Sequence, residues 1–345
     1  MYGFLADVHI GCNIKNEDII KSLDFYFDII RKHEETCHQI FVCGDLFDHK
    51  LNTEELIFAA NIMTKIVCNK CCHNGNNVPV TFIHGTYSHD QEQYKIFIPL
   101  IEEITGVRIR YLEHCGTYHL DNNVKVLAIP QEYGDIDYTR AFNDTYDIII
   151  GHGPISSITK TPCPVGASEI CLSADQLGDI SKVCVFGHYH QYVNFGKNVF
   201  YAGTNLRWKF GEPDEKVFLI CDDNYNVTKI KNPYAMEFNK IEITSIDQLR
   251  NEISKEIKSP IRFIVHCKEN ELEEYHSIFN LYKKNKMISC KFMSEKDMDK
   301  QIKIMDNAPV TNIEPIPALL SYIKDKYDVD VREIIEHYVQ KINKE

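Results

Sequence analysis

Residues 39–48 read QIFVCGDLFD, a mainly apolar run followed by a glycine and two aspartates. Such a run is too short for a helix and is typical of a buried strand, and a glycine lets the backbone turn sharply where the strand ends. Asp45 and Asp48 then stand at the start of the next loop. Because the carboxyl ends of the strands in an open α/β sheet lie along one edge, side chains from distant segments can meet there.

The sequence around this segment alternates between short strands and helices. Residues 2–6 form an earlier apolar run and residues 80–83 a later one. Between these runs, apolar residues recur at the three- and four-residue spacing of a helix: Ile20, Leu23, Phe27 and Ile30, then, after a cap at Thr53, Leu56, Ala60, Met63 and Val67. The order strand, helix, strand, helix, strand predicts a mostly parallel sheet. Further strands are expected at 107–111, 124–129, 146–150, 183–186, 199–201 and 217–221.

A second, smaller alternation begins near residue 236. Strands are expected at 240–243, 261–266 and 288–292, with helices at 246–257 and 272–282. Residues 307–317 carry three prolines and read as a linker, and two amphipathic helices are expected around 319–327 and 331–342. The predicted organisation is a domain over 1–235, a capping domain over 236–300, and a linker with a helical segment over 301–345.

The composition excludes several classes of protein. With 345 residues, 44% of them hydrophobic and 26% charged, the chain is expected to be globular and soluble with a sizeable core. Its net charge of −12 gives no basic field, so a polyanion would have to bind locally. No apolar run approaches the ~18 residues of a membrane span, and no leader segment is expected. The 13 cysteines are scattered through apolar runs, which favours free thiols and a cytoplasmic location.

Metal-ligand side chains stand in the loops after five of these strands. The segments are Asp7-Val8-His9, Gly44-Asp45-Leu46-Phe47-Asp48, Ser88-His89-Asp90, Gly151-His152-Gly153 and Gly187-His188-Tyr189-His190. Carboxylates and imidazoles together suit Mn²⁺, Zn²⁺ or Fe²⁺ better than Ca²⁺, and the set is large enough for two ions that share one carboxylate. Two ions ~4 Å apart would clamp a phosphate ester and activate water, so the pattern predicts phosphoester hydrolysis. His89 is not needed as a ligand and could act as general acid, with Asp48 holding its ring.

In this order the five segments resemble the calcineurin-like metallophosphoesterases. Residues 200–212, FYAGTNLRWKFGE, are similar to a block typical of the SbcD nuclease branch, which includes the meiotic-recombination-eleven repair nucleases. The resemblance spans about residues 5–212. It implies an α/β fold: a β-sandwich flanked by helices, with a small α/β capping, DNA-binding domain and a C-terminal helical tail. It also implies an Mn²⁺-dependent DNA nuclease of an SbcCD-like repair and recombination complex, with 3′–5′ exonuclease and single-strand or hairpin endonuclease activity.

The resemblance assigns a role to each matching residue. Asp7, His9 and His190 would hold one metal ion, His152 and His188 the other, and Asp45 would bridge the two, while His89 matches the catalytic histidine. Two divalent ions are implied, with Mn²⁺ favoured over Mg²⁺, Zn²⁺ or Fe²⁺.

One segment departs from the family pattern. The family usually has Gly-Asn-His-Asp, whereas this chain has Gly85-Thr86-Tyr87-Ser88-His89-Asp90. The asparagine ligand of the second metal is therefore missing. Ser88 could replace it through its hydroxyl or through a held water, or Thr86 could, and a neutral hydroxyl would make a weaker site. This departure and the compact size point to a phage or viral branch, whose location would be the host cytoplasm.

The resemblance also implies partners. These are DNA, an SbcC-like coiled-coil ATPase bound by the C-terminal helices, and a second copy of the chain in a homodimer, with no membrane. Two other functions stay open. One is a non-catalytic assembly subunit of such a complex, which the missing asparagine leaves open, and the other is a phosphodiesterase or phosphatase for small molecules, against which the SbcD-like block and the appended modules argue.

Several further residues have two interpretations each. Asp90 is expected to fix its loop rather than bind metal, and His84 to be a strand-end residue rather than a ligand. The cluster Cys68-Asn69-Lys70-Cys71-Cys72-His73 is either a zinc site or a set of partly buried thiols. Two basic groups either contact DNA or have a structural role, namely Arg207-Trp208-Lys209, and Lys283, Lys284 and Lys286.

Overall fold

The computed structural model describes residues 1–12, 16–133, 138–157, 170–207, 212, 215–257, 261–282 and 288–294. The chain divides into two compact units. The first is formed mainly by the described residues of Met1–Lys240, and the second mainly by those of Ile241–Lys255, of 263–282 and of 290–294.

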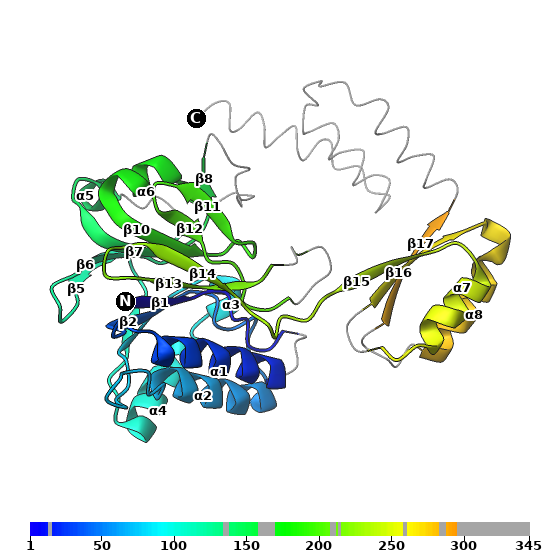
Figure 1. Cartoon of the computed structure of the whole chain (residues 1–345), viewed down its shortest axis with the longest axis horizontal. Coiled ribbons are helices and arrows are strands. Elements are labelled where there is room, and N and C mark those ends of the chain that lie inside the picture. Colours follow the sequence, from blue (N-terminus) through cyan, green and yellow to red (C-terminus); the bar gives the residue numbers. More distant parts are fainter. Residues whose placement is uncertain are drawn as a thin grey trace, which may run out of the picture. The chain divides into compact units, whose positions relative to one another are not determined.

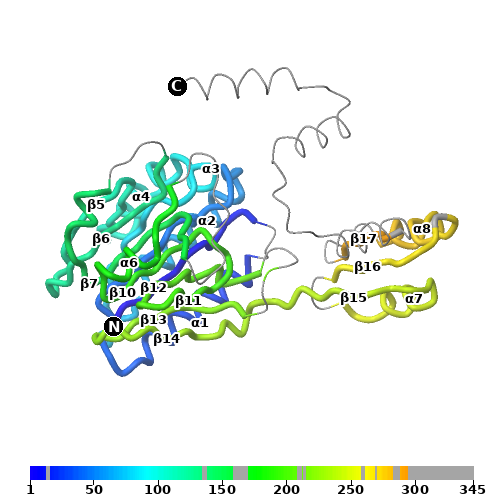
Figure 2. The backbone as a smooth tube through the Cα atoms, turned by 90° about the horizontal axis from the view of Figure 1, so that it is seen from above, coloured from blue at the N-terminus to red at the C-terminus, as the bar shows by residue number. Residues whose placement is uncertain are grey.

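The first unit contains two six-stranded sheets (Figure 1). The first sheet has the order β14-β13-β1-β2-β3-β4, formed by β1 (Tyr2–Leu5), β2 (Gln39–Cys43), β3 (Val80–Ile83), β4 (Arg110–Leu112), β13 (Val217–Cys221) and β14 (Val227–Lys231). Strands β1 to β4 are parallel, as the sequence predicts. Strand β13 pairs antiparallel with β1, next to the N-terminus in Figure 2, and with β14.

The second sheet has the order β11-β12-β10-β7-β6-β5. Its strands are β5 (Gly116–His119), β6 (Lys125–Ile129), β7 (Tyr146–His152), β10 (Ser181–Gly187), β11 (Val193–Gly196) and β12 (Val199–Tyr201). The central strands β6, β7, β10 and β12 run parallel, and the two edge strands are antiparallel. A separate pair is formed by β8 (Ile155–Ser156) and β9 (Leu172–Ser173).

Helices cover the outer face of each sheet, so the first unit is a four-layered sandwich (Figure 1). The first sheet is covered by α1 (Asn16–Lys32), α2 (Thr53–Val67) and α4 (Gln93–Thr105), and the second by α5 (Thr139–Phe142) and α6 (Ala174–Ile180). Three apolar clusters fill the three gaps between layers. The middle cluster joins the two sheets, with Phe4, Phe41, Ile150 and Val185 among its buried members. This architecture confirms the predicted fold class.

Two details of the helices differ from the sequence prediction. In α1 the predicted Leu23, Phe27 and Ile30 are buried, but the first turn buries Ile19 in place of Ile20, which is 36% exposed. Helix α2 is capped by Asn52 rather than by Thr53. The Asn52 side chain accepts hydrogen bonds from the N–H groups of Glu54 and Glu55, and the Glu55 carboxylate accepts one from the N–H of Asn52.

The second unit has a sheet of order β15-β16-β17, formed by β15 (Asn239–Ile243), β16 (Ile261–Cys267) and β17 (Ile288–Ser294). Its helices are α7 (Ile246–Ser254) and α8 (Leu272–Tyr282), with a 3₁₀ turn at Glu269–Glu271. Leu249, Phe263, Val265 and Tyr275 are buried in its core. Helix α7 ends at Ser254, three residues before the predicted end, and the predicted linker and C-terminal helices lie outside the described residues.

Candidate metal centre

The ends of five strands from the two sheets carry the predicted ligands. Asp7 and His9 follow β1, Asp45 follows β2, and the loop with His89 follows β3. From the second sheet, His152 is the last residue of β7, and His188 and His190 follow β10.

The structure brings most of these side chains together. Three groups each have ligand atoms within 4.8 Å of one another: Asp7, His9 and His190; Asp7, Asp45 and His152; and His9, Asp45 and His89. Asp7 and Asp45 each occur in two groups, so the three form one continuous cluster. The His188 side chain is in none of these groups. Its ring centroid lies 5.4 Å from that of His152, and the backbone N–H of His188 donates to Asp7 Oδ1 at 2.8 Å.

The backbone turns sharply at the ligands themselves. Asp7, His9 and Asp45 have φ values of +49°, +50° and +46°, and His188 has +93°. Non-glycine residues rarely adopt positive φ, and such conformations gather at functional sites where the surrounding structure enforces them. Gly44 has φ +77°, and a Cβ on it would lie 2.3 Å from His152 Nδ1, so glycine is required for the close approach of this ring.

Asp7 is a carboxylate whose surroundings suit a cation. Its side chain is buried, and among the described residues its Oδ2 atom has no hydrogen-bond partner. Burial, together with the nearby charge of Asp45, raises the pKa of Asp7 to about 6 against the opposing effect of His152 and His9. A buried carboxylate oxygen without a donor is costly, and a metal ion would remove that cost.

Asp45 and His152 form the charged centre of the cluster. The His152 Nε2 atom lies 3.3 Å from Asp45 Oδ2, and its Nδ1 donates to the carbonyl of Cys43 at 2.8 Å, which leaves Nε2 as the ligand atom. Burial by itself would raise the pKa of Asp45, but His152 and the other nearby imidazoles outweigh it and lower that pKa. Burial would lower the pKa of His152, whereas Asp45 raises it to about 9.

Asp48 supports the cluster in a different way from the one predicted. We expected its carboxylate to hold His89. Instead, the carboxylate lies 3.2 Å from Nδ1 of His9 and 3.2 Å from Nδ1 of His49, and His89 Nδ1 donates to the backbone carbonyl of Asp48. The His89 ring centroid lies 4.9 Å from that of His9. Asp48 therefore holds the His9 ring by its side chain and the His89 ring by its main chain.

The loop that lacks the family asparagine places Thr86, and not Ser88, at the cluster. The Thr86 Oγ1 atom donates to Asp45 Oδ2 at 3.1 Å and lies 3.3 Å from His152 Nε2 and 2.9 Å from Gln131 Oε1. Ser88 is exposed, and its carbonyl accepts a hydrogen bond from Gln91. The sequence did not indicate Gln131, which follows β6 and which no motif marks.

Asp90 fixes this loop, as the sequence predicts. Its buried carboxylate accepts hydrogen bonds from the N–H groups of Asp45, Phe47 and Gly85 at 2.8–3.1 Å, and so ties the loops after β2 and β3 together. His84 is buried at the end of β3, where its Nδ1 lies 2.8 Å from the hydroxyl of Tyr111.

The donor set fits divalent cations. Two carboxylates and several imidazoles converge, and two of the imidazoles have Nδ1 held by a carboxylate or a carbonyl so that Nε2 faces the cluster. When bound, such cations would neutralise charge on a phosphate ester and activate water.

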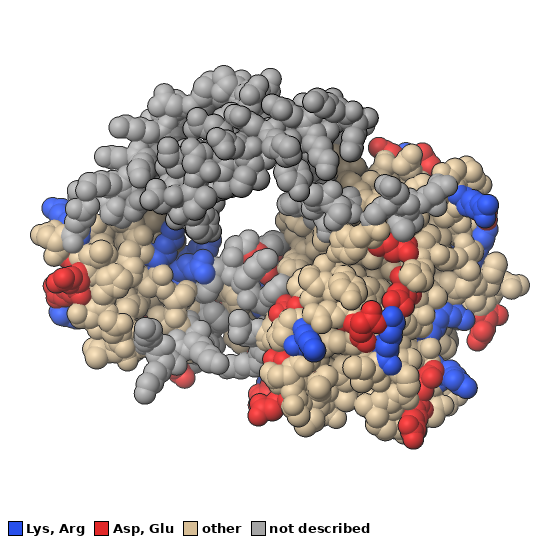
Figure 3. All heavy atoms as spheres, turned by 180° about the vertical axis from the view of Figure 1, so that it is seen from behind, with Lys and Arg blue, Asp and Glu red and all other residues tan. Residues whose placement is uncertain are grey.

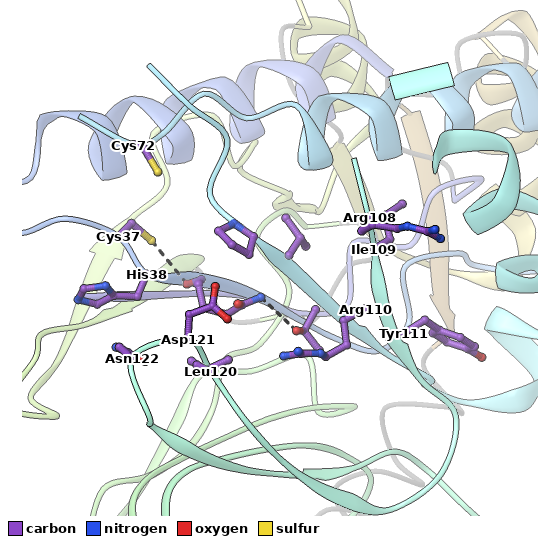
Figure 4. A pocket seen from close by; sticks show the side chains of 14 residues that line it. Cys37, His38, Cys72, Arg108, Ile109, Arg110, Tyr111, Leu120, Asp121 and Asn122 are labelled. Carbon is purple, nitrogen blue, oxygen red and sulfur yellow. Dashed lines mark hydrogen bonds between the residues drawn. The ribbon is translucent and has the colours of Figure 1, made fainter. Parts of the chain in front are cut away.

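The cysteine segment does not form a second metal site within the part of the chain that the structure describes, because the three groups contain no cysteine. Cys37 and Cys72 instead line a cleft of about 710 Å³, with Arg108 and Arg110 toward its other end (Figure 4). This cleft lies at the first residues of β2, β3 and β4, whereas the metal centre lies at the opposite ends of these parallel strands.

The basic groups are only partly described. Arg207 is buried and donates to the carbonyls of Ala235 and Met236 at 3.1 and 2.6 Å, which favours the structural interpretation of this residue. Trp208, Lys209, Lys283, Lys284 and Lys286 lie outside the described residues. Acidic and basic side chains are interspersed on the face of the first unit that Figure 3 shows. No helix among the described residues is long and apolar enough to span a bilayer.

Comparison with known proteins places the chain in a family. Residues 2–192, more than half of the sequence, match the model of the calcineurin-like phosphoesterases. No curated protein matches the sequence. Among solved structures, protein TT1561 of Thermus thermophilus is similar at 9% identity and a TM-score of 0.40, over 67% of this chain and 97% of that one. The chain belongs to the calcineurin-like phosphoesterase family, whose members are metal-dependent hydrolases.

Proposed function

We propose that this chain is the nuclease subunit of an SbcCD-like complex and hydrolyses DNA phosphodiesters with two divalent cations, of which Mn²⁺ is the first choice. The observation that carries the proposal is the convergence of Asp7, His9, Asp45, His152 and His190 beside His89. We expect 3′–5′ exonuclease activity and cleavage of single strands or hairpins.

Each residue of the cluster has a part in this reaction. Asp45 has ligand atoms within 4.8 Å of those of His9 and also of His152, which are assigned to different ions, and this suits a carboxylate shared by two cations. His89 donates its Nδ1–H to the Asp48 carbonyl, so Nε2 is the ring nitrogen that would pass a proton to the leaving oxygen, and it carries that proton in the imidazolium form. Thr86, which contacts Asp45 and His152, would supply an oxygen in place of the family asparagine.

Support for DNA as substrate comes from the sequence around this site. Residues 200–212 are similar to the SbcD block, and the second unit and the C-terminal segment have the order expected of a capping domain and an ATPase-binding tail. A homodimer is part of the same proposal. The surface in Figure 3 mixes both signs of charge, so the cations themselves would provide the local attraction for the phosphates.

The test is a nuclease assay on linear duplex, hairpin and single-stranded DNA with Mn²⁺, Mg²⁺, Zn²⁺ or Fe²⁺. We expect cleavage with Mn²⁺, and a loss of about 100-fold or more in His89→Ala at unchanged metal content. His119→Ala, which alters an exposed histidine on β5, is the matched control and should cleave at the normal rate. An unchanged rate in His89→Ala would reject the acid assignment.

The same assay separates the two alternatives. A neutral hydroxyl at Thr86 is a poorer ligand than an amide oxygen, and this favours the non-catalytic assembly subunit as second candidate. That function predicts DNA or ATPase binding without cleavage at any metal concentration. A small-molecule phosphodiesterase would hydrolyse bis(p-nitrophenyl) phosphate and leave every DNA substrate intact.

A further inference from the structure

A buried ion pair lies next to the metal centre and has no part in the chemistry described so far. It joins the carboxylate of Glu212 to the ammonium of Lys216, with 2.7 Å between Oε2 and Nζ. The two side chains are only 4% and 1% exposed. Burying two opposite charges costs several kcal/mol of desolvation, and well-packed apolar residues often stabilise a fold equally well. Stability alone therefore does not account for this pair.

Lys216 holds the main chain of a predicted metal ligand. Its Nζ donates to the carbonyl of His190 at 3.1 Å and to Oγ1 of Thr204 at 2.5 Å. The N–H of Thr204 donates to the same His190 carbonyl at 3.1 Å. These hydrogen bonds connect the loop after β10 to the loop after β12. They meet at His190, whose side chain belongs to the cluster.

Glu212 faces the ring of the same residue. Its Oε1 atom lies 3.9 Å from Nδ1 of His190, which is an ion-pair distance, and His190 shares a ligand group with Asp7 and His9. With Nδ1 facing the carboxylate, Nε2 is the ring nitrogen that would bind a cation. Two further imidazoles of the cluster also have Nδ1 next to an oxygen, at shorter distances: His9 Nδ1 lies 3.2 Å from Asp48 Oδ1, and His152 Nδ1 lies 2.8 Å from the Cys43 carbonyl oxygen.

We propose that Glu212, held in place by Lys216, is a positioning residue that orients the His190 imidazole for the cation shared with Asp7 and His9. A carboxylate on the far nitrogen of a ligating histidine fixes its tautomer and ring orientation and raises its basicity. Lys216 contacts both the Glu212 carboxylate and the His190 carbonyl, so the buried Lys216 ammonium fixes the main chain of His190 and the carboxylate that faces its ring. This proposal rests on the metal centre and is independent of DNA as the substrate.

The first test is a titration of the full-length protein with Mn²⁺ alone, followed by calorimetry or by the EPR signal of free Mn²⁺. Glu212→Gln keeps the shape of the side chain and removes its charge. We expect one of the two Mn²⁺ equivalents to bind 10- to 100-fold more weakly and the other to be unchanged. Glu215→Gln is the matched control, because Glu215 is 51% exposed and pairs with Lys229 at the surface.

The second test distinguishes positioning from general structural support. If Glu212 acts through His190, adding Glu212→Gln to His190→Ala should cause no further loss of Mn²⁺ affinity, because the ring that it orients is gone. Losses that add in the double variant would overturn the proposal, as would normal affinity in Glu212→Gln.

A further variant covers the case in which Glu212→Gln does not fold. Glu212→Asp keeps the charge for Lys216 and withdraws the carboxylate from His190 by one methylene group. We expect it to fold and to lose affinity at the same one equivalent, and unchanged affinity would overturn the proposal. Since no DNA is present, a negative nuclease assay leaves this result unaffected.

Discussion

The charge of His152 depends on its neighbour Asp45 in the metal centre. It is buried, its Nδ1 is bonded to the Cys43 carbonyl, and its Nε2 faces Asp45. A metal ion at Nε2 requires the neutral ring, whereas the metal-free protein favours the charged ring, because Asp45 overcomes the effect of burial and raises the pKa to about 9. Protons and metal ions therefore compete for the same nitrogen atom.

This competition predicts how the stability of the metal-free protein depends on pH. The pKa of His152 is higher in the folded state than the 6.5 of the unfolded chain, so the stabilisation is complete below pH 6.5 and is lost as pH rises through about 9. The total loss from this residue is on the order of 3 kcal/mol. The pKa of Asp7 is raised to about 6 in the folded protein, so its contribution to the free energy of unfolding changes at lower pH. That contribution is lost as pH rises from about 4 to 6.

The measurement is urea unfolding in the presence of a chelator between pH 6.5 and 9.5, with the wild type compared with His152→Gln. The wild type should lose more unfolding free energy over this range than the variant. Parallel curves for the two proteins would contradict the assignment of the raised pKa to His152.

At the scale of elements, the sharp turns at the strand ends are what bring ligands of two sheets together. Gly44 follows β2 with φ +77°, and the His152 ring from β7 packs against its backbone. A Cβ at position 44 would lie 2.3 Å from Nδ1 of His152, which belongs to the second sheet. It would lie 2.7 Å from the Cα of Gly85, which follows β3 of the first sheet. The absence of a side chain at Gly44 thus lets His152 of the second sheet come close to the first sheet, and the positive φ lets the chain turn after β2.

Gly44→Ala should therefore cost more than backbone strain alone. Gly75 has nearly the same φ, +78°, and nothing lies within 4 Å of a Cβ built on it, so Gly75→Ala measures the strain alone, about 1–2 kcal/mol. We expect Gly44→Ala to lose several kcal/mol of unfolding free energy and at least 10-fold in Mn²⁺ affinity. Equal losses in the two variants, measured by urea unfolding and Mn²⁺ titration, would show that the His152 contact is unimportant.

Elements with a continuous apolar face could be predicted from the sequence, and others could not. Strands β1, β2 and β3 are buried throughout, and their apolar runs mark them. Strand β14 is exposed at most positions, and α4 has Pro99 in its interior, so neither has a clear pattern. The ligands followed from their positions after strands, because parallel strands share an edge.

The contacts inside the loops could not be predicted in the same way. Whether Thr86 or Ser88 reaches Asp45, and whether Asp48 uses its side chain or its main chain on His89, depends on local φ and ψ values. The Glu212–Lys216 pair was also missed, although Glu212 closes the block that resembles SbcD, because neither residue has the spacing of a ligand motif.

At the scale of the whole molecule, we assign the proposed reaction to the first unit and the binding of partners to the rest of the chain. The metal centre is formed by residues of the first unit alone. The apolar stripes of residues 319–327 and 331–342 are proposed to bind the root of an SbcC-like coiled coil, since short helices, as predicted there from the sequence, need a surface to pack on.

Deletion of residues 310–345 tests this division. The truncated protein should lose association with the coiled-coil ATPase in co-purification and keep its basal nuclease rate, because no metal ligand is removed. Undiminished co-purification would reject the docking role of the C-terminal segment.

The central claim is that ligands from two sheets form one centre for two cations. Anomalous diffraction from crystals soaked in Mn²⁺ tests it directly. Two peaks are expected beside Asp45, one among Asp7, His9 and His190 and the other at His152 and Thr86. A map without peaks at these residues, or with its peaks elsewhere on the molecule, would contradict the account.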